Sequence, residues 1–141
     1  MTHFQTSQLL GAILLLAAAC SPLAADEVSP TVDEAEKLAV DLKHQDFAVR
    51  EAATRKLPSL GPSIIAPVTE IALQENLEAG LRAVSVLEQL YLSDDAVAFD
   101  HAEASLNQLI AQSKLPAVAQ KAAQTLENNQ FTVTQRRAIA E

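Results

Sequence analysis

Apolar residues recur at helical spacing along this chain, and one short pattern of them returns at offsets of 30 and then 39 residues. Within each copy the three residues are four apart, which places them on one face of a helix. The three copies are Val49, Ala53 and Leu57; Ala79, Ala83 and Leu87; and Val118, Ala122 and Leu126. A period in this range is typical of stacked helical hairpins, which bury their apolar faces only against neighbouring hairpins. The pattern therefore predicts an all-α fold built as an α-solenoid.

Capping and breaking residues divide the first part of the chain into four expected helices. A capping box that begins at Thr31 precedes the first, and Asp46 caps the second. Pro67 lies inside the third, where we expect a kink because proline removes a backbone hydrogen bond. The expected boundaries are residues 32–43, Asp46 to Leu60, Pro62 onward, and about 77–92.

Three further helices are expected in the second part of the chain. Asp95 precedes the fifth, Pro116 opens the sixth, and the sixth is predicted to stop at Asn128. A second capping box at Thr132 begins a seventh helix that has no stop signal before Glu141. Residues 129–141 are therefore expected to be the start of a further helix. Its open end indicates either a chain cut from something longer or a partner that covers it.

The apolar residues of each helix define the face that we expect to be buried. In the second helix these are Val49, Ala52, Ala53, Leu57 and Leu60, and in the fifth they are Phe99, Ala102, Leu106, Leu109 and Ile110. In the fourth helix, apolar residues from Leu77 to Tyr91 cover well over half of the circumference. A helix that is apolar over so wide an arc is predicted to lie at the centre of the stack. Its remaining strip, expected to face solvent, consists of Glu78, Arg82, Ser85 and Gln89.

Residues 1–25 are predicted to be a signal peptide, and residues 26–30 a linker. The run of apolar residues and glycine from Leu9 to Ala19 is too short to span a bilayer and is followed by small residues. The other interpretation of this run is a buried helix. Export predicts a periplasmic protein or one associated with the cell envelope.

Cys20 is the only cysteine of the sequence, so an internal disulfide is excluded. The residues before it resemble a bacterial lipoprotein cleavage box, although Leu16 lies four rather than three positions upstream. Two alternatives stay open. Cys20 is either the lipidated first residue of the mature protein, or it is discarded by cleavage near Ala25.

The charge of the chain limits its partners. Asp and Glu outnumber Lys and Arg by 18 to 10, which gives a formal net charge of −8. Nucleic-acid binding needs clustered basic residues, so no nucleic-acid partner is expected. An anionic membrane surface is disfavoured for the same reason, and a lipid at Cys20 is the expected route to a membrane.

The stretch from Asp46 to Leu90 resembles the HEAT repeats of armadillo-type helical proteins. Matching positions of a repeat's second helix are Asp46, Val49-Arg50, Ala52-Ala53, Leu57 and Leu60-Gly61, and Pro62 to Glu75 resembles the first helix of the next repeat. The likeness covers residues 31–128 and is weaker after Ser93. It implies a right-handed α-solenoid of about three HEAT-like helical hairpins, similar to modules of exported bacterial proteins. Such repeats generally act as protein-interaction scaffolds, and the resemblance implies no catalytic residue.

Polar residues of the types used in catalysis or metal binding have structural explanations. The densest cluster is Asp94, Asp95, Asp100, His101 and Glu103. The last three point in different directions on a helix, whereas ligands of one metal need spacings of three or four. Asp46 and Arg50 are four apart and are expected to form a helix-stabilising pair, and Glu51 and Arg55 repeat this spacing on what we expect to be a solvated face. No cofactor, metal or catalytic residue is therefore expected.

These observations favour an exported protein–protein interaction scaffold without catalysis. Its partner is expected on the exposed strips of the second and fourth helices, at Glu51, Arg55, Arg82, Ser85 and Gln89. One alternative is a structural cap or spacer for a following domain. The other is a metal-binding or enzymatic protein that uses His44, His101 and the acidic residues.

Overall fold

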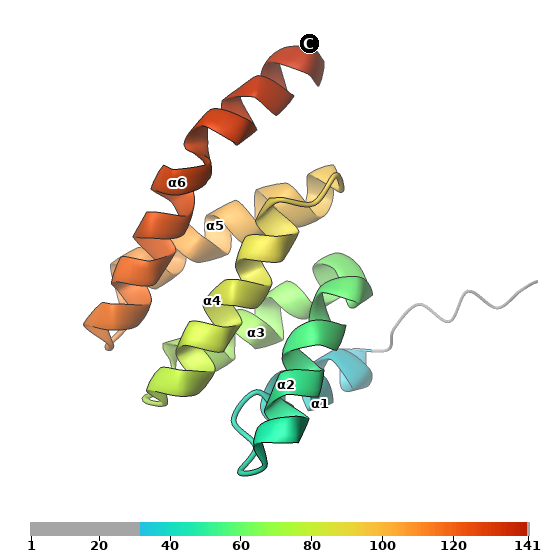
Figure 1. Cartoon of the computed structure of the whole chain (residues 1–141), viewed down its shortest axis with the longest axis vertical. Coiled ribbons are helices and arrows are strands. Elements are labelled where there is room, and N and C mark those ends of the chain that lie inside the picture. Colours follow the sequence, from blue (N-terminus) through green and yellow to red (C-terminus); the bar gives the residue numbers. More distant parts are fainter. Residues whose placement is uncertain (1–31, 141) are drawn as a thin grey trace, which may run out of the picture.

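The computed structural model describes residues 32–140, which are all-α, as the sequence pattern predicts (Figure 1). No strand occurs within that range. The elements are α1 (Val32–Asp41), α2 (Phe47–Lys56), the 3-10 helix η1 (Leu57–Ile64), α3 (Ile65–Leu73), α4 (Leu77–Tyr91), α5 (Ala96–Gln112) and α6 (Pro116–Ala140). The predicted signal peptide with Cys20, the linker, Thr31 and Glu141 lie outside the described residues.

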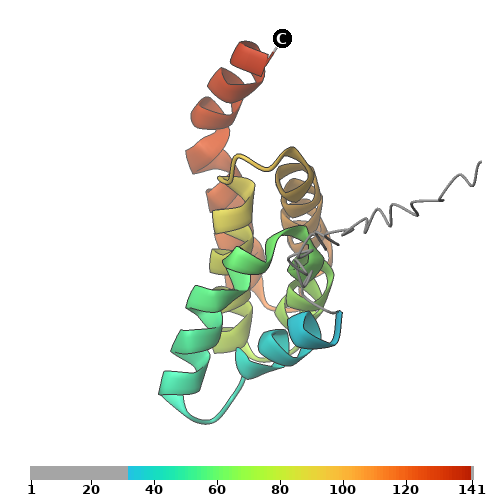
Figure 2. The ribbon, with the colours of Figure 1, turned by 90° about the vertical axis from the view of Figure 1, so that its right-hand side faces the viewer.

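The helices form two layers, which Figure 2 shows side by side. In one layer α3 packs against both α1 and α5, and in the other α4 packs against both α2 and α6. Helices that follow each other in sequence, such as α3 and α4 or α5 and α6, pack across the layers. The apolar core lies between the two layers.

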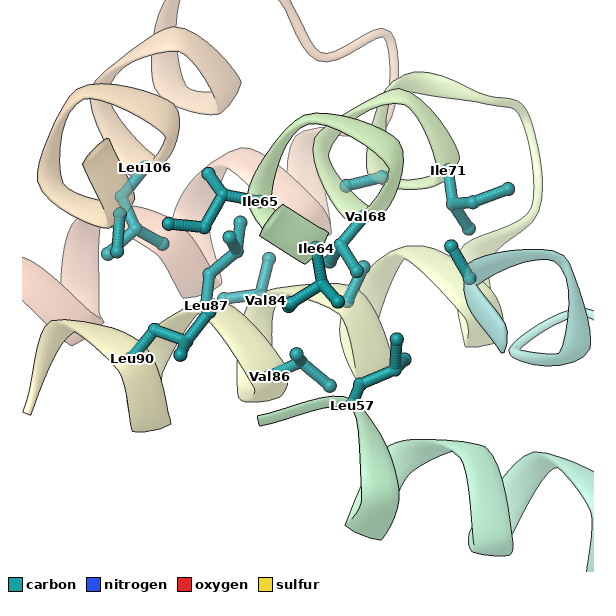
Figure 3. Close-up of a cluster of buried hydrophobic side chains, with 14 of the residues drawn as sticks. Leu57, Ile64, Ile65, Val68, Ile71, Val84, Val86, Leu87, Leu90 and Leu106 are labelled. Carbon is teal, nitrogen blue, oxygen red and sulfur yellow. The ribbon is translucent and has the colours of Figure 1, made fainter. Parts of the chain in front are cut away.

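Helix α4 is the central element of the core, as its wide apolar arc predicts. It contacts η1 and every α-helix from α2 to α6. Val84, Val86 and Leu87 on α4 are fully buried, and they point toward Leu57, Ile64 and neighbouring apolar side chains (Figure 3). Each fully buried side chain of this size stabilises the fold by about 1.5–3 kcal/mol relative to its exposed state.

Side-chain caps fix where three of the helices begin. The Asp46 carboxylate accepts a hydrogen bond from the amide of Ala48 at 2.8 Å, at the start of α2. Asn76 and Asp95 cap α4 and α5 in the same way. Each cap satisfies an amide that the helix itself leaves without a partner. The predicted cap at Asp46 is confirmed.

The predicted bend at Pro67 is wrong, and the chain turns at Gly61 instead. Pro67 is the third residue of α3, within the first turn, where a backbone N–H has no partner inside the helix. Gly61 has φ 68° and ψ −151°, a conformation that side chains with a Cβ rarely adopt. The α2 helix also ends at Lys56 rather than Leu60, because the segment from Leu57 continues as η1.

The predicted sixth and seventh helices are one continuous helix, α6. No glycine or proline occurs between Ala117 and Ala140, so nothing breaks the backbone pattern near Asn128. The amide of Asn129 donates to the carbonyl oxygen of Thr125, which is compatible with an unbroken helix. The final turns of α6 extend beyond the other helices (Figure 1).

Three residues expected on buried faces are exposed. Ala52 is exposed on α2, Leu77 is 48% exposed at the first position of α4, and Ile110 is 40% exposed on α5. Ala52 and Ile110 each lie next to a buried residue, Ala53 and Leu109, and the packed face of each helix is narrower than we predicted.

None of the helices within residues 32–140 has both the length and the apolar character that crossing a membrane requires.

Candidate interaction surface

Four charged side chains join α2 to α4 on the outer side of their layer. Arg82 of α4 binds Glu51 of α2 at 3.1 Å through its terminal nitrogen, and Glu78 at 3.2 Å through Nε. Arg50 of α2 donates through Nε to the same Glu78 oxygen at 2.9 Å. Glu78 therefore bridges two guanidinium groups that come from different helices.

Arg50 also holds the loop that precedes α2. A terminal nitrogen of its guanidinium donates to the backbone oxygens of His44 and Gln45, at 2.8 and 2.9 Å. In the same loop, Nδ1 of His44 accepts a hydrogen bond from the amide of Asp46 at 3.0 Å. The side chain of Arg50 is only 17% exposed, and its guanidinium group joins this loop to Glu78 of α4.

Phe47 completes the site as an exposed aromatic ring beside two cations. The carbon at the centre of the guanidinium lies 5.6 Å from the ring centroid for Arg50 and 5.4 Å for Arg82. Such cation–π contacts stabilise by about 0.5–1 kcal/mol at exposed sites. Phe47 is nevertheless 60% exposed. We call the set Phe47, Arg50, Glu51, Glu78 and Arg82 the α2–α4 surface.

The electrostatics of the α2–α4 surface favour the charged forms of Glu78 and Arg82. The hydrogen bond from Arg82 has the largest effect on the Glu78 carboxyl and lowers its pKa; desolvation opposes this, and the charge of Arg50 lowers the pKa further. The hydrogen bond to Glu51 raises the pKa of Arg82. The contact between Glu78 and Arg82 is therefore an ion pair at neutral pH.

Two of the five predicted partner-face residues belong to this surface. Glu51 and Arg82 are joined directly, although Arg82 is less exposed than expected, at 17% of its side chain. Ser85 lies one turn further along α4, where its hydroxyl oxygen accepts a hydrogen bond from Lys121 of α6 at 2.9 Å. Arg55 and Gln89 are exposed near the ends of α2 and α4.

The ion pair expected within α2 is replaced by pairs between helices. Arg50 binds Glu78 rather than Asp46, whose carboxylate caps the helix instead. Glu51 binds Arg82 rather than Arg55. An ion pair between neighbouring helices forms charge-assisted hydrogen bonds in a less solvated position. Such a pair is therefore favoured over an exposed ion pair within one helix.

Sequence reasoning missed Phe47 and Arg50 as parts of this face, and it placed Glu78 on the exposed strip of the fourth helix without counting it among the partner residues. A signal for the charged pairs was present, because Arg50 and Glu78 are 28 residues apart and Glu51 and Arg82 are 31 apart. Both separations lie close to the 30-residue offset of the repeated pattern. Opposite charges at nearly that offset occupy neighbouring positions on successive helices of one layer.

The residues considered for metal binding lie apart from this surface or have other roles. Within residues 32–140, no group of three His, Cys, Asp or Glu side chains is placed to hold a metal ion. Asp95 caps α5, and His44 stabilises the loop before α2. His101 lines a depression between α3 and α5, on the opposite layer.

Comparison with protein-family models, with curated proteins and with solved structures finds no match to the chain. The α2–α4 surface offers fixed hydrogen-bond donors and acceptors of both signs around an exposed ring. This combination suits recognition of a protein surface.

Proposed function

We propose that this protein is an exported protein–protein interaction scaffold of HEAT-repeat type, without catalysis. In this proposal α1 with α2, α3 with α4, and α5 with α6 are three HEAT-like hairpins of a right-handed α-solenoid. Two observations support it. The helices alternate between two layers, and the middle positions of the repeated pattern, Ala53, Ala83 and Ala122, are all buried. Small residues at equivalent places let successive second helices pack closely.

The α2–α4 surface is the observation that carries the binding proposal. An aromatic ring that is 60% exposed loses little conformational freedom on binding when two guanidinium groups already contact it. Aromatic and arginine side chains also dominate the binding energy of protein interfaces. The paired charges around the ring would form a polar rim that excludes water from the contact.

Export is part of the same proposal and rests on the N-terminal sequence. The apolar run ending at Ala19 supports secretion, and Cys20 remains a candidate lipidation site. The scaffold would then act in the periplasm or at the cell envelope. Intact mass of protein from its native cell would test this: loss of 19 or about 25 residues supports export, and the full-length mass contradicts it.

The second candidate function is a structural cap or spacer for another domain, and the end of α6 favours it. Phe131 is 73% exposed and Ile139 is 86% exposed on α6, and the final turns of this helix extend beyond the other helices (Figure 2). Exposed apolar side chains on a projecting helix are suited to burial against a neighbouring domain. The two functions use different surfaces, so one experiment separates them.

That experiment is site-specific crosslinking in the cell that produces the protein. A photoreactive residue replaces Arg55 or Gln89, which flank the α2–α4 surface, and in controls it replaces Glu36 of α1 or Gln112 of α5, which are exposed on the other layer. The scaffold proposal predicts that Arg55 and Gln89 yield the same protein adduct and that the controls do not. Adducts of equal yield from all four positions, or none from Arg55 and Gln89, contradict it.

A further inference from the structure

The two layers differ sharply in charge. The sequences of α1, α3 and α5 contain one basic residue, Lys37, and seven acidic residues: Asp33, Glu34, Glu36, Asp41, Glu70, Asp100 and Glu103. The sequences of α2, α4 and the part of α6 up to Gln135 contain five basic and four acidic residues. The negative charge of the helices is therefore concentrated on the α1–α3–α5 layer.

The same layer has an open depression between α3 and α5, with a volume of about 410 Å³. Its lining includes buried Ile65 and exposed Ala66 from α3, and exposed Ala104 from α5. Small alanine side chains on both walls leave room for a larger apolar side chain. The depression is therefore an open groove with apolar side chains on both walls, and the polar side chains of Thr69, Glu70, His101, Ser105 and Gln108 also line it.

Polar residues of the groove restrict the kind of occupant. Glu70 lines it and is exposed, and no Lys or Arg is among the residues that line it. Thr69 is buried and already donates its hydroxyl hydrogen to the carbonyl oxygen of Ile65 at 2.7 Å. The lining of the groove therefore favours an occupant that carries a positive charge beside an apolar group.

We propose that the α3–α5 groove docks a basic protein segment, which inserts an apolar side chain between Ala66 and Ala104 and places Lys or Arg beside Glu70. Glu70 is the acidic residue that lines the groove, and the net negative charge of the α1–α3–α5 helices would attract such a segment before contact, since charges on one face steer the approach of an opposite charge. This site lies on the layer opposite the α2–α4 surface. The groove proposal therefore does not depend on the function proposed above.

Capped synthetic peptides test the groove directly. The probe is a 12-residue peptide with lysines on both sides of a central leucine pair. One control peptide has glutamate in place of every lysine, and the other has serine in place of the leucines. Amide resonances of Ala66 and Ala104 and the imidazole resonances of His101, all lining the groove, report binding by NMR titration. The lysine–leucine peptide should shift these resonances, and both controls should shift them less.

Protein variants then separate the groove from general charge attraction. Glu70→Gln should weaken binding of the lysine–leucine peptide about two- to fivefold, the range expected for one exposed charge pair. Glu36→Gln on α1 removes the same charge away from the groove and should have a smaller effect. Ala104→Phe should fill the groove and abolish the shift at Ala66, whereas Ala117→Phe on α6 should leave it.

Four results would overturn the proposal. The first is no shift at Ala66 and Ala104 with millimolar lysine–leucine peptide, and the second is an equal shift with the glutamate peptide. The third is equal weakening by Glu70→Gln and Glu36→Gln, which would mean charge attraction without a groove site. The fourth is unchanged binding to Ala104→Phe when that variant keeps the helicity of the parent protein.

Discussion

The contacts of α4 with its two layer neighbours differ in kind. Toward α2, the outer contact is made by charged side chains, with Arg82 bound to Glu51 and Arg50 bound to Glu78. Toward α6, the contact includes a close apolar part, where a Cβ added to Gly80 would lie 2.8 Å from a methyl carbon of fully buried Val118, besides the hydrogen bond from Lys121 to Ser85. The α4–α6 contact is therefore part of the core, whereas the α2–α4 contact leaves charged groups and Phe47 accessible to a partner.

This difference predicts unequal energetic effects of substitution. Losing a buried apolar contact removes transfer free energy and leaves a cavity or a clash. Losing a partly exposed ion pair costs much less, because water solvates the charges that remain. The following predictions run from the largest expected effect to the smallest.

Leu87→Ala should have the largest effect, because Leu87 is fully buried in the centre of α4. The expected loss is about 2–5 kcal/mol of unfolding free energy, measured by chemical denaturation. Leu77→Ala on the same helix is the matched control, since Leu77 is 48% exposed. Its expected cost is under about 1 kcal/mol. Equal costs for the two variants would show that the packed face of α4 is assigned wrongly.

Gly80→Leu tests the close approach of α4 and α6. The new side chain has no room beside Val118, so α6 must shift, at an expected cost of about 1–3 kcal/mol. Ala117→Leu, at an exposed position of α6, should change the unfolding free energy by no more than about 0.5 kcal/mol. If Gly80→Leu is as stable as the parent protein, the two helices do not pack as described.

Arg82→Met tests the polar contact of α4 with α2. Methionine keeps much of the apolar stem but removes the charge, so the expected cost is under about 1 kcal/mol, less than for Gly80→Leu. A double-mutant cycle with Glu51→Gln measures the coupling, and Arg55→Met supplies an exposed control. A coupling energy of zero would mean that the Arg82–Glu51 pair does not hold the two helices together.

The smallest expected effect is a dependence of stability on pH. The pKa of Glu78 is lowered in the folded protein from its usual value of 4.5. The stabilisation by its ionised form is therefore fully present above that value and is lost as the pH falls through the lower folded-state pKa. Denaturation of the parent protein and of Glu78→Gln should differ at pH 7, and the difference should shrink in acid. A difference that grows in acid would contradict this sign.

The sequence predicted the fold class and the central position of α4 because apolar periodicity is a direct consequence of burial. The repeated Ala83 and Leu87 are buried as expected. The bend was misplaced because Pro67 lies in a first turn, which depends on where α3 starts, and that start follows from packing around η1. The end of the sixth helix was misplaced because capping residues such as Thr132 also occur inside helices.

The candidate surface was only partly predictable. Glu51 and Arg82 were expected on one exposed face, and the structure brings them together. The pairing of Glu51 with Arg82, like that of Arg50 with Glu78, depends on how α2 and α4 are rotated relative to each other. The spacing of residues within one helix does not contain this information. Phe47 was missed because an exposed aromatic at the start of a helix has no periodic signal.

The most direct test of the account compares two exposed phenylalanines. Phe47 is 60% exposed beside Arg50 and Arg82, and Phe131 is 73% exposed in the second half of α6. The measurement is the yield of the protein adduct formed by a photoreactive residue at position 89, with Phe47→Ala or Phe131→Ala added. Binding through the α2–α4 surface predicts a strong loss with Phe47→Ala and an unchanged yield with Phe131→Ala. An unchanged yield with Phe47→Ala, or a loss only with Phe131→Ala, would contradict the account and favour a structural role for the end of α6.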